Sequence, residues 1–373
     1  MNIPLVRLPR PLWFQPRRRH VLHALATIAP ALALAACGGG GGGSSGGGGI
    51  GPTAAVVTDR RVKVSTAPDV SLQVRDWQKP GATGPVIVLL AGLGGNARYF
   101  DSLAPALSVD FSRVVAISRR GYGLSDKPLP VNSATQHYEV DTLAADLKAV
   151  LDDLGLQRVV LAGHSIAGNE LTRFAGRFPQ RVQGLIYLDT TFDYTVDGDT
   201  GGEELPTNQA LSEPVAKPED NQSMQAAIAF NQRKFKRWWP PLEANLRDAL
   251  DVQPDGSVRP NTPESVETAM DTAAHKFSPD YTEVRAPTLV ITALFADNRD
   301  LMPWLEMPLD ARTEKDVADF VRIYRRARIT DATRLVAALR TPHHVTLDNC
   351  SHGDFLMERE ADVLRAIRFM TWA

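Results

Sequence analysis

Short apolar runs alternate with helical patterns along residues 61–188, and this alternation constrains the fold more than any other feature of the chain. Such a series is typical of a mostly parallel sheet with helices on its faces. The runs at 85–90 and 113–117 are almost entirely apolar, as expected of strands buried on both faces. We therefore predict an α/β fold. Its expected elements are strands at 61–65, 70–77, 85–90, 113–117, 158–162 and 182–188, the first two forming an antiparallel edge, and helices at 140–154 and 166–178.

The strand pattern stops after residue 189 and returns at 287–292. Residues 190–285 lack buried-strand runs and are rich in acidic residues, proline and helical stretches. Neither flank alone resembles a complete sheet, so we predict one core, 52–189 with 286–373, and a helical cap inserted at 190–285. The expected later elements are a helix at 315–339, a strand at 345–347 and a closing helix at 358–370.

The first 51 residues do not contribute to this core. Residues 1–36 carry five arginines, no acidic residue and an apolar run over 21–36, which predicts a signal peptide. The run is shorter than the roughly 20 residues that a membrane-spanning helix needs. Cys37 follows Leu-Ala-Ala, which resembles the lipobox of bacterial lipoproteins, and residues 38–51 form a tether made almost wholly of glycine and serine.

We therefore expect export, lipidation of Cys37 and anchoring to a bacterial envelope membrane, on its periplasmic or surface side. Secretion without a lipid anchor is the alternative. Adjacent arginines at Arg18 and Arg19 also resemble a twin-arginine signal, so the export route stays open.

Charge and cysteine content exclude several classes of protein. The chain has 43 acidic and 41 basic residues, and five of the basic ones lie in the predicted leader. A mildly acidic mature protein is a poor partner for nucleic acid. Cys37 and Cys350 are the two cysteines, which excludes a disulfide scaffold and a cysteine-rich metal site. We predict no cofactor and no metal; the oligomeric state and the role of Cys350 stay open.

The segment 159–168, Val-Val-Leu-Ala-Gly-His-Ser-Ile-Ala-Gly, places Ser165 where a buried strand turns abruptly into a helix. A nucleophile at such a strained corner needs very small neighbours, and Gly163 and Ala167 meet that need. A phosphate-binding turn is the alternative, but the segment has neither the G-x-G-x-x-G spacing nor a P-loop lysine. We predict Ser165 as the nucleophile.

A serine nucleophile needs a base, and the base needs an acid. His352 follows the last predicted strand and is the expected base. Asp297, shortly after the 287–292 strand, is the expected acid. Asp189, at the end of the preceding strand, is the second choice. Asp300 is the third, and we expect it to be a solvated loop carboxylate or a helix cap.

An acyl-transfer site also needs two backbone N–H groups for the oxyanion. We expect one from Ile166, which follows the nucleophile. We expect the other from Leu93 in the glycine-rich stretch Ala-Gly-Leu-Gly-Gly at 91–95.

Together, the glycine-rich stretch 92–95, the elbow 163–168 and the late Ser351-His352 resemble the motifs of the α/β-hydrolase superfamily. Residues 120–126 also resemble a loop of its capped members. The resemblance covers residues 61–373 and implies an eight-stranded sheet with a helical cap over the site. Ala91 and Ser118 stand where many relatives carry histidine and aspartate, and the glycine usual after the 287–292 strand is missing, which leaves the acid open.

These features predict a cofactor-independent serine hydrolase that acts on a small or medium carboxylic ester through Ser165, His352 and Asp297. Amide, lactone or carbon–carbon hydrolysis, perhydrolysis and a catalytically silent binding protein are the alternatives. Dehalogenases and epoxide hydrolases of the superfamily use aspartate at the elbow, so Ser165 argues against them.

Two side-chain clusters in the predicted cap are open to more than one interpretation. The aromatic set is expected to pack the cap or to line a pocket, and the basic set is expected to be a solvated helix face. The two sets are Phe230, Phe235, Trp238 and Trp239, and Arg233, Lys234, Lys236 and Arg237.

Overall fold

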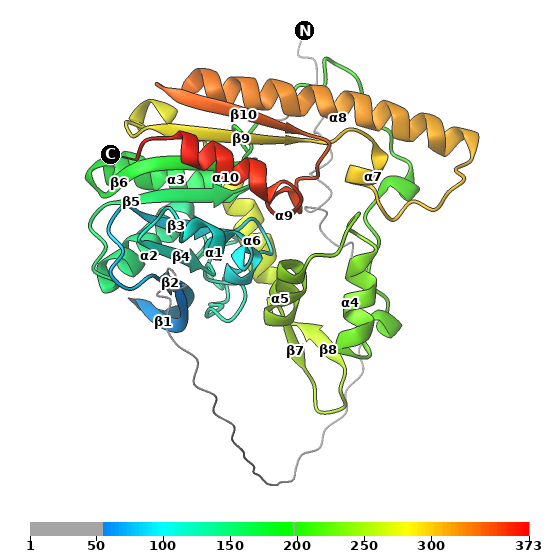
Figure 1. Cartoon of the computed structure of the whole chain (residues 1–373). Coiled ribbons are helices and arrows are strands. Elements are labelled where there is room, and N and C mark those ends of the chain that lie inside the picture. Colours follow the sequence, from blue (N-terminus) through cyan, green and yellow to red (C-terminus); the bar gives the residue numbers. More distant parts are fainter. Residues whose placement is uncertain (1–54, 197, 373) are drawn as a thin grey trace, which may run out of the picture.

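An eight-stranded sheet forms the centre of the computed structural model, which describes residues 55–196 and 198–372 (Figure 1). The strand order is β1-β2-β4-β3-β5-β6-β9-β10. Strand β2 is antiparallel to β1 and β4, and every other pair of neighbours is parallel. The strands are β1 (Val56–Thr66), β2 (Asp69–Gln78), β3 (Val86–Leu90), β4 (Arg113–Ile117), β5 (Val159–His164), β6 (Val182–Leu188), β9 (Thr288–Leu294) and β10 (Pro342–Asp348). The predicted α/β fold with an antiparallel edge is confirmed.

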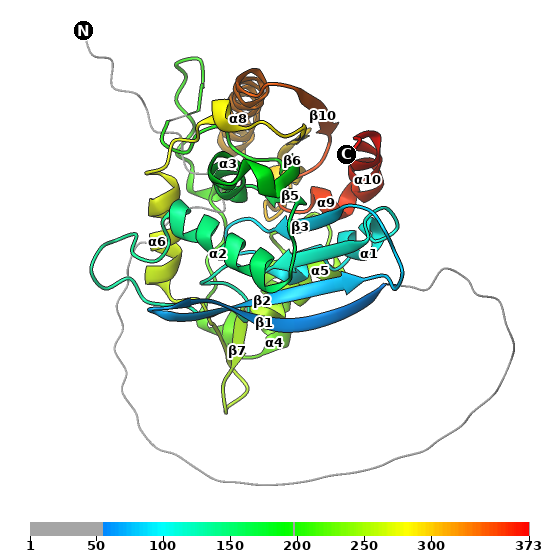
Figure 2. The same ribbon diagram turned by 90° about the vertical axis from the view of Figure 1, so that its left-hand side faces the viewer.

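Helices cover both faces of the sheet because alternate residues of the central strands are apolar on both sides (Figure 2). In β3, Ile87 and Leu89 belong to one apolar cluster, and Val88 and Leu90 belong to the other. Short helix α1 and the C-terminal α10 pack on the first face, and α2 and α3 pack on the second. The helices of the core are η2 (Ala97–Phe100), α1 (Leu103–Leu107), α2 (Val140–Asp153), α3 (Ala167–Arg177), η3 (Pro179–Arg181), α7 (Asn298–Leu301), α8 (Ala311–Ala338), α9 (Phe355–Glu358) and α10 (Glu360–Phe369).

Three predicted elements are clearly longer in the structure than in the sequence pattern. Strand β1, predicted at 61–65, extends over Val56–Thr66 in its antiparallel pairing with β2. Helix α8 begins at Ala311 because the Asp310 carboxylate accepts hydrogen bonds from the N–H groups of Arg312 and Thr313, both at 3.0 Å. Strand β10 begins at Pro342, since it lies at the sheet edge, where polar residues are tolerated.

The segment between β6 and β9 contains helices and one hairpin, and in Figure 1 its α4, α5 and β7–β8 form a lobe beside the sheet. The hairpin was not expected from the sequence. Helix α5 also packs on the core through Leu242, and the last helix, α6, does so through Val266 and Met270, which join a cluster with Tyr122 and Tyr138. The elements are η4 (Gln209–Leu211), η5 (Pro218–Asn221), α4 (Met224–Gln232), α5 (Pro240–Asp248), β7 (Leu250–Val252), β8 (Val258–Pro260), α6 (Glu264–Ala274) and η6 (Tyr281–Glu283).

The predicted signal peptide, Cys37 and the glycine-serine tether lie outside the described residues. Within residues 55–196 and 198–372, no helix combines the length and apolar character needed to cross a membrane.

Candidate active site

The abrupt corner predicted at Ser165 is present between β5 and α3. Ser165 has a φ of +56°, which is unusual for a residue with a side chain, and its N–H donates to the Leu188 carbonyl at 3.0 Å. A Cβ at Gly163 would lie 2.8 Å from Leu171 Cδ1, so strand and helix approach this closely only because residue 163 is glycine. The chain thus holds Ser165 in a strained conformation between tightly packed elements.

His352 lies in the loop after β10, and its Nδ1 lies 2.5 Å from Asp189 Oδ2. Asp189 follows β6 directly and has a φ of +50°. Its backbone N–H donates to the Ile291 carbonyl of β9 at 2.7 Å. Histidine and carboxylate are therefore paired at the edge of the sheet where the parallel strands end, and Ser165 and His352 line one cavity there.

The expectation that Asp297 would be the acid is corrected by this geometry. Asp297 is exposed and caps α7, where its Oδ1 accepts a hydrogen bond from the Arg299 N–H at 2.8 Å. Strands β6 and β9 are parallel neighbours, so the loops after both reach the same edge. Asp189 turns toward His352 at the first residue beyond its strand, whereas Asp297 already belongs to a helix start.

Asp300 is not a solvated cap. Its buried carboxylate accepts from the Ala296 N–H at 2.8 Å and pairs with Lys236 Nζ at 3.0 Å.

The Asp189 carboxylate is buried but stays ionised. Burial alone would raise its pKa, but the Arg328 guanidinium at 2.7 Å and the hydrogen bond to His352 lower it further than burial raises it. The pKa of Asp189 is therefore held well below its usual range. The ionised carboxylate faces Nδ1 of His352 and fixes the orientation of its ring.

A second histidine holds the loop that carries His352. His164 Nε2 donates to the His352 carbonyl at 3.0 Å, and its ring stacks on Tyr99 with centroids 5.4 Å apart. Burial lowers the pKa of His164 well below its usual value, so this ring is neutral. The Tyr99 hydroxyl donates to the Gly353 carbonyl at 2.9 Å, which ties the loop at a second point.

The glycine-rich stretch after β3 approaches Ser165 closely. A Cβ at Gly92 would lie 2.9 Å from His164 Nδ1 and 3.2 Å from Ser165 Cβ. Leu93 lines a cavity together with Ser165 and His352, and packs against the apolar cluster that contains Ile166. The two predicted oxyanion donors thus lie around the serine; that their N–H groups bind an oxyanion stays a prediction.

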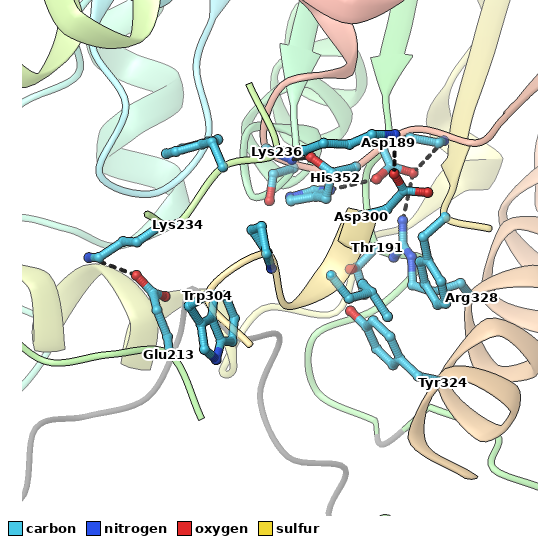
Figure 3. Close-up of a pocket in the computed structure, with 18 of the residues that line it drawn as sticks. Asp189, Thr191, Glu213, Lys234, Lys236, Asp300, Trp304, Tyr324, Arg328 and His352 are labelled. Carbon is cyan, nitrogen blue, oxygen red and sulfur yellow. Dashed lines mark hydrogen bonds and ion pairs between the residues drawn. The ribbon is translucent and has the colours of Figure 1, made fainter. Parts of the chain in front are cut away.

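Two cavities meet at Ser165 and His352. The first has a volume of about 340 Å³ and lies between the 92–95 loop and the α4–α5 lobe. The second lies beside Asp189 and Arg328 and is shown in Figure 3. Glu213, Lys234 and Phe235 of the segment between β6 and β9 line both cavities.

Two lysines of the basic set line this site, in the segment that follows the end of α4. The expected solvated face is wrong for Lys234, whose side chain is 17% exposed, whereas Lys236 stays 45% exposed. Lys234 Nζ pairs with Glu213 at 2.8 Å, and Lys236 pairs with Asp300, as Figure 3 shows. No pattern in the sequence indicates these pairs, because their partners lie 21 and 64 residues away along the chain.

The aromatic set divides between packing and pocket. Phe235 and Trp238 line the larger cavity, whereas Phe230 is buried and the Trp239 Nε1–H donates to Asp354 Oδ2 at 3.3 Å. Cys350 is fully buried, and burial raises the pKa of its thiol to about 12, so it fills space near the histidine loop as an unreactive thiol. Among the described residues, no group of three or more His, Cys, Asp or Glu side chains is arranged to hold a metal ion.

Comparison with known proteins places this geometry in a family. The 2-(acetamidomethylene)succinate hydrolase of Mesorhizobium japonicum is 29% identical over 132 residues, which are 35% of this chain and 42% of that protein. A non-heme chloroperoxidase of Streptomyces lividans is 34% identical over 173 residues, which are 46% of this chain and 56% of that protein. Each match thus spans about half of the relative's length.

A solved structure of E-2-(acetamidomethylene)succinate hydrolase superposes with a TM-score of 0.59 at 18% identity, over 84% of this chain and 98% of that one. Residues 85–294, more than half of the chain, match a protein family whose description is "alpha/beta hydrolase fold". The chain therefore belongs to the α/β-hydrolase family.

Proposed function

We propose that the chain is a serine hydrolase that cleaves a compact carboxylic ester. The observation that carries this proposal is the pairing of His352 with the buried Asp189 carboxylate at 2.5 Å, in a site that also holds Ser165 at a strained corner. Asp189 accepts the Nδ1–H of His352, which leaves Nε2 free to take a proton from Ser165 Oγ. The three residues supply the nucleophile, the base and the acid that acyl transfer requires.

In the proposed reaction, Ser165 Oγ attacks the ester carbonyl while His352 Nε2 takes its proton. The tetrahedral intermediate places its oxyanion toward the N–H groups of Leu93 and Ile166. Collapse of the intermediate breaks the carbon–oxygen bond, and His352 returns the proton to the departing alcohol. Water, deprotonated by the same histidine, then releases the acid and restores Ser165.

The shape of the larger cavity supports a compact substrate. Its volume of about 340 Å³ lies near the lower end of ligand sites, and Leu242 and Leu246 of α5 line it. Phe235 and Trp238 add apolar surface to its lining, and the paired Lys234 and Glu213 add polar surface. We infer that short and medium acyl groups fit and that long-chain fatty acyl groups do not.

A fluorophosphonate probe tests the mechanism without knowledge of the natural substrate. The purified protein should gain one phosphonyl adduct, mapped by peptide mass spectrometry to Ser165. Ser165→Ala should neither label nor hydrolyse p-nitrophenyl butyrate, and its thermal midpoint should stay near that of the parent. Full activity in this variant would refute the mechanism, and a folded but unlabelled parent would favour a binding protein.

A substrate panel decides between the reactions that such a site supports. Short-chain esters should be turned over faster than octanoate and longer esters, because of the cavity size. Amides, lactones, β-diketones and hydrogen peroxide with acetate test the other reactions of the same nucleophile. Preference for one of these over simple esters would replace the ester in the proposal and leave the three catalytic residues in place.

We also propose that the protein is anchored to the cell envelope through a lipid on Cys37, which rests on the sequence of residues 1–51. Cys37→Ser should move the protein from the membrane fraction to the soluble fraction. Unchanged partitioning of this variant would contradict the anchor.

A further inference from the structure

The two oxygens of Asp189 have different partners. Oδ2 faces His352, whereas Oδ1 accepts hydrogen bonds from the Ala293 N–H at 2.9 Å and from Arg328 Nη2 at 2.7 Å. Both charged side chains are removed from water, with exposed fractions of 1% for Asp189 and 12% for Arg328. Figure 3 shows Arg328 reaching from α8 to Asp189 on the side away from His352.

Arg328 is itself held between two carboxylates. Asp331, one turn later on α8, lies 3.7 Å from Arg328 Nη1, and it accepts a hydrogen bond from the Phe192 N–H at 3.0 Å. An unpaired charge at this depth is strongly unfavourable, so removal of one charged side chain should destabilise its neighbours in the series. The series consists of Asp331, Arg328, Asp189 and His352.

We propose that Arg328 is a positioning residue for the reaction, which holds Asp189 toward His352 and sets the pH at which the His352–Asp189 pair takes up a proton. The inference rests on the proposed serine hydrolase function. A guanidinium on Oδ1 leaves Oδ2 as the acceptor for His352 Nδ1–H, and this orients the carboxylate. It also keeps the buried acid ionised, which a serine-histidine nucleophile requires.

The direction of the pH effect follows from charge. The active form of the pair has neutral His352 and ionised Asp189, so the pair carries one negative charge. Removal of the nearby guanidinium makes proton uptake by the pair easier, whichever of the two residues receives the proton. The acidic limb of the pH–activity profile should therefore move to higher pH when Arg328 is lost. It should move to lower pH when Asp331 is lost, by a smaller amount, because burial raises the pKa of Asp331 and reduces its negative charge at acidic pH.

Five ionisable groups near Asp189 do not compete with this effect. Burial raises the pKa of the three tyrosines and the thiol and lowers the pKa of His164, so these groups stay neutral between pH 5 and 8. The groups are Tyr99 from η2, His164 from β5, Tyr194 after β6, Tyr324 from α8 and Cys350 after β10. Asp354, two residues from His352, has a pKa raised by burial to about 6, but it is present in the parent and in every variant, so its titration is common to all the profiles that are compared.

The test compares four variants in the full protein. Arg328→Met removes the charge and keeps much of the side-chain volume, Arg328→Lys keeps the charge, and Asp331→Asn keeps an acceptor for the Phe192 N–H. Arg312→Met is the matched control, because Arg312 lies on the same helix with its side chain 87% exposed. The measurements are kcat/KM for a neutral short-chain ester from pH 4.5 to 9, the thermal midpoint, and the NMR titration midpoint of the His352 ring.

For Arg328→Met we expect kcat/KM at pH 8 to fall about tenfold or more, and the acidic limb to move up by about one pH unit, as a charge a few ångström away requires. Arg328→Lys should restore the position of the limb but only part of the rate, because one ammonium does not reproduce the planar guanidinium. Asp331→Asn should move the limb down by a smaller amount, and Arg312→Met should change nothing.

Arg328→Met could lower the thermal midpoint while the acidic limb of the pH–activity profile and kcat/KM stay unchanged. This result would show a purely structural role for Arg328 and would overturn the inference. If Arg328→Met does not fold, the downward shift in Asp331→Asn decides, and an unmoved limb in that variant overturns it equally. If the parent neither labels with fluorophosphonate nor hydrolyses esters, the proposed function fails. The NMR midpoints of the His352 ring in the variants then still support or refute the effect of Arg328 on the pair.

Discussion

Replacement of Asp189 by asparagine should abolish most activity for a reason that the structure makes specific. Ala293 N–H and Arg328 Nη2 both donate to Oδ1, so in the Asp189→Asn variant the side-chain amide oxygen must occupy this place. The amide NH₂ then faces His352 Nδ1 and requires it to accept. The ring proton therefore moves to Nε2, and the nitrogen that faces Ser165 no longer accepts a proton.

The wrong tautomer should lower kcat/KM by about 10⁴, which corresponds to about 5.4 kcal/mol of transition-state stabilisation. The change also leaves the buried Arg328 opposite a neutral group. Loss of one partner of a buried ion pair costs about 3–5 kcal/mol of folding free energy, so the thermal midpoint should fall as well. Kinetics must therefore be measured well below the midpoint of the variant.

The matched control is Asp297→Asn, because asparagine also caps helices and Asp297 is exposed. Its kcat/KM for p-nitrophenyl butyrate and its rate of labelling by fluorophosphonate should stay within about twofold of the parent, since a surface substitution of this kind changes little. A crippled Asp297→Asn together with an active Asp189→Asn would refute the assignment of the acid. Loss of activity in both would show that the loop after β9 also takes part.

Two further outcomes follow from single contacts. Gly92→Ala places a methyl group 2.9 Å from His164 Nδ1 and 3.2 Å from Ser165 Cβ, so it should displace the 92–95 loop. We expect kcat/KM to fall by about 100-fold while the protein stays folded. Near-normal kinetics would contradict the close approach of this loop to Ser165. Burial of Asp354 raises its pKa to about 6, so the stability that this carboxyl contributes is complete below pH 4 and is lost as the pH rises to 6. Between pH 4 and pH 7 the parent should lose up to about 3 kcal/mol of unfolding free energy relative to Asp354→Asn, measured by urea denaturation. A difference between the two proteins that does not depend on pH would contradict this prediction.

Much of the core was predictable because burial leaves a strong pattern in sequence. Strands β3, β4, β5, β6 and β9 are apolar on both faces, and their limits agree with the prediction to within two residues. The hairpin β7–β8 was not predicted, since its strands have three residues each and are largely exposed. The position of Ser165 was predictable for a different reason, because its corner needs small residues on both sides.

The pairing of His352 with Asp189 was not predictable from spacing. Asp189 and Asp297 follow adjacent parallel strands, so both satisfy the rule that the acid lies at this edge of the sheet. The choice depends on the backbone of Asp189, whose φ of +50° turns the carboxylate toward His352, and no residue pattern encodes that angle. Arg328 was equally hidden, because α8 carries several arginines and only packing decides which one faces Asp189.

The adjacency of β6 and β9 also limits how the segment between them can be shortened. Because the two strands run in the same direction, the chain that leaves the end of β6 must pass back along the sheet before β9 begins. The turn η6 belongs to this returning part of the chain, with Tyr281 and Val284 buried on the α3 face of the sheet. Val266 and Met270 of α6 are buried instead against residues that follow the ends of the strands. A minimal enzyme without the lobe would therefore need its new junction upstream of Glu264. The lobe is nevertheless not a separable accessory, because Leu242 of α5 is buried in the core and Asn245 Oδ1 accepts a hydrogen bond from the Asn96 N–H at 2.7 Å. The chain between α6 and β9 completes the crossover that makes the sheet possible.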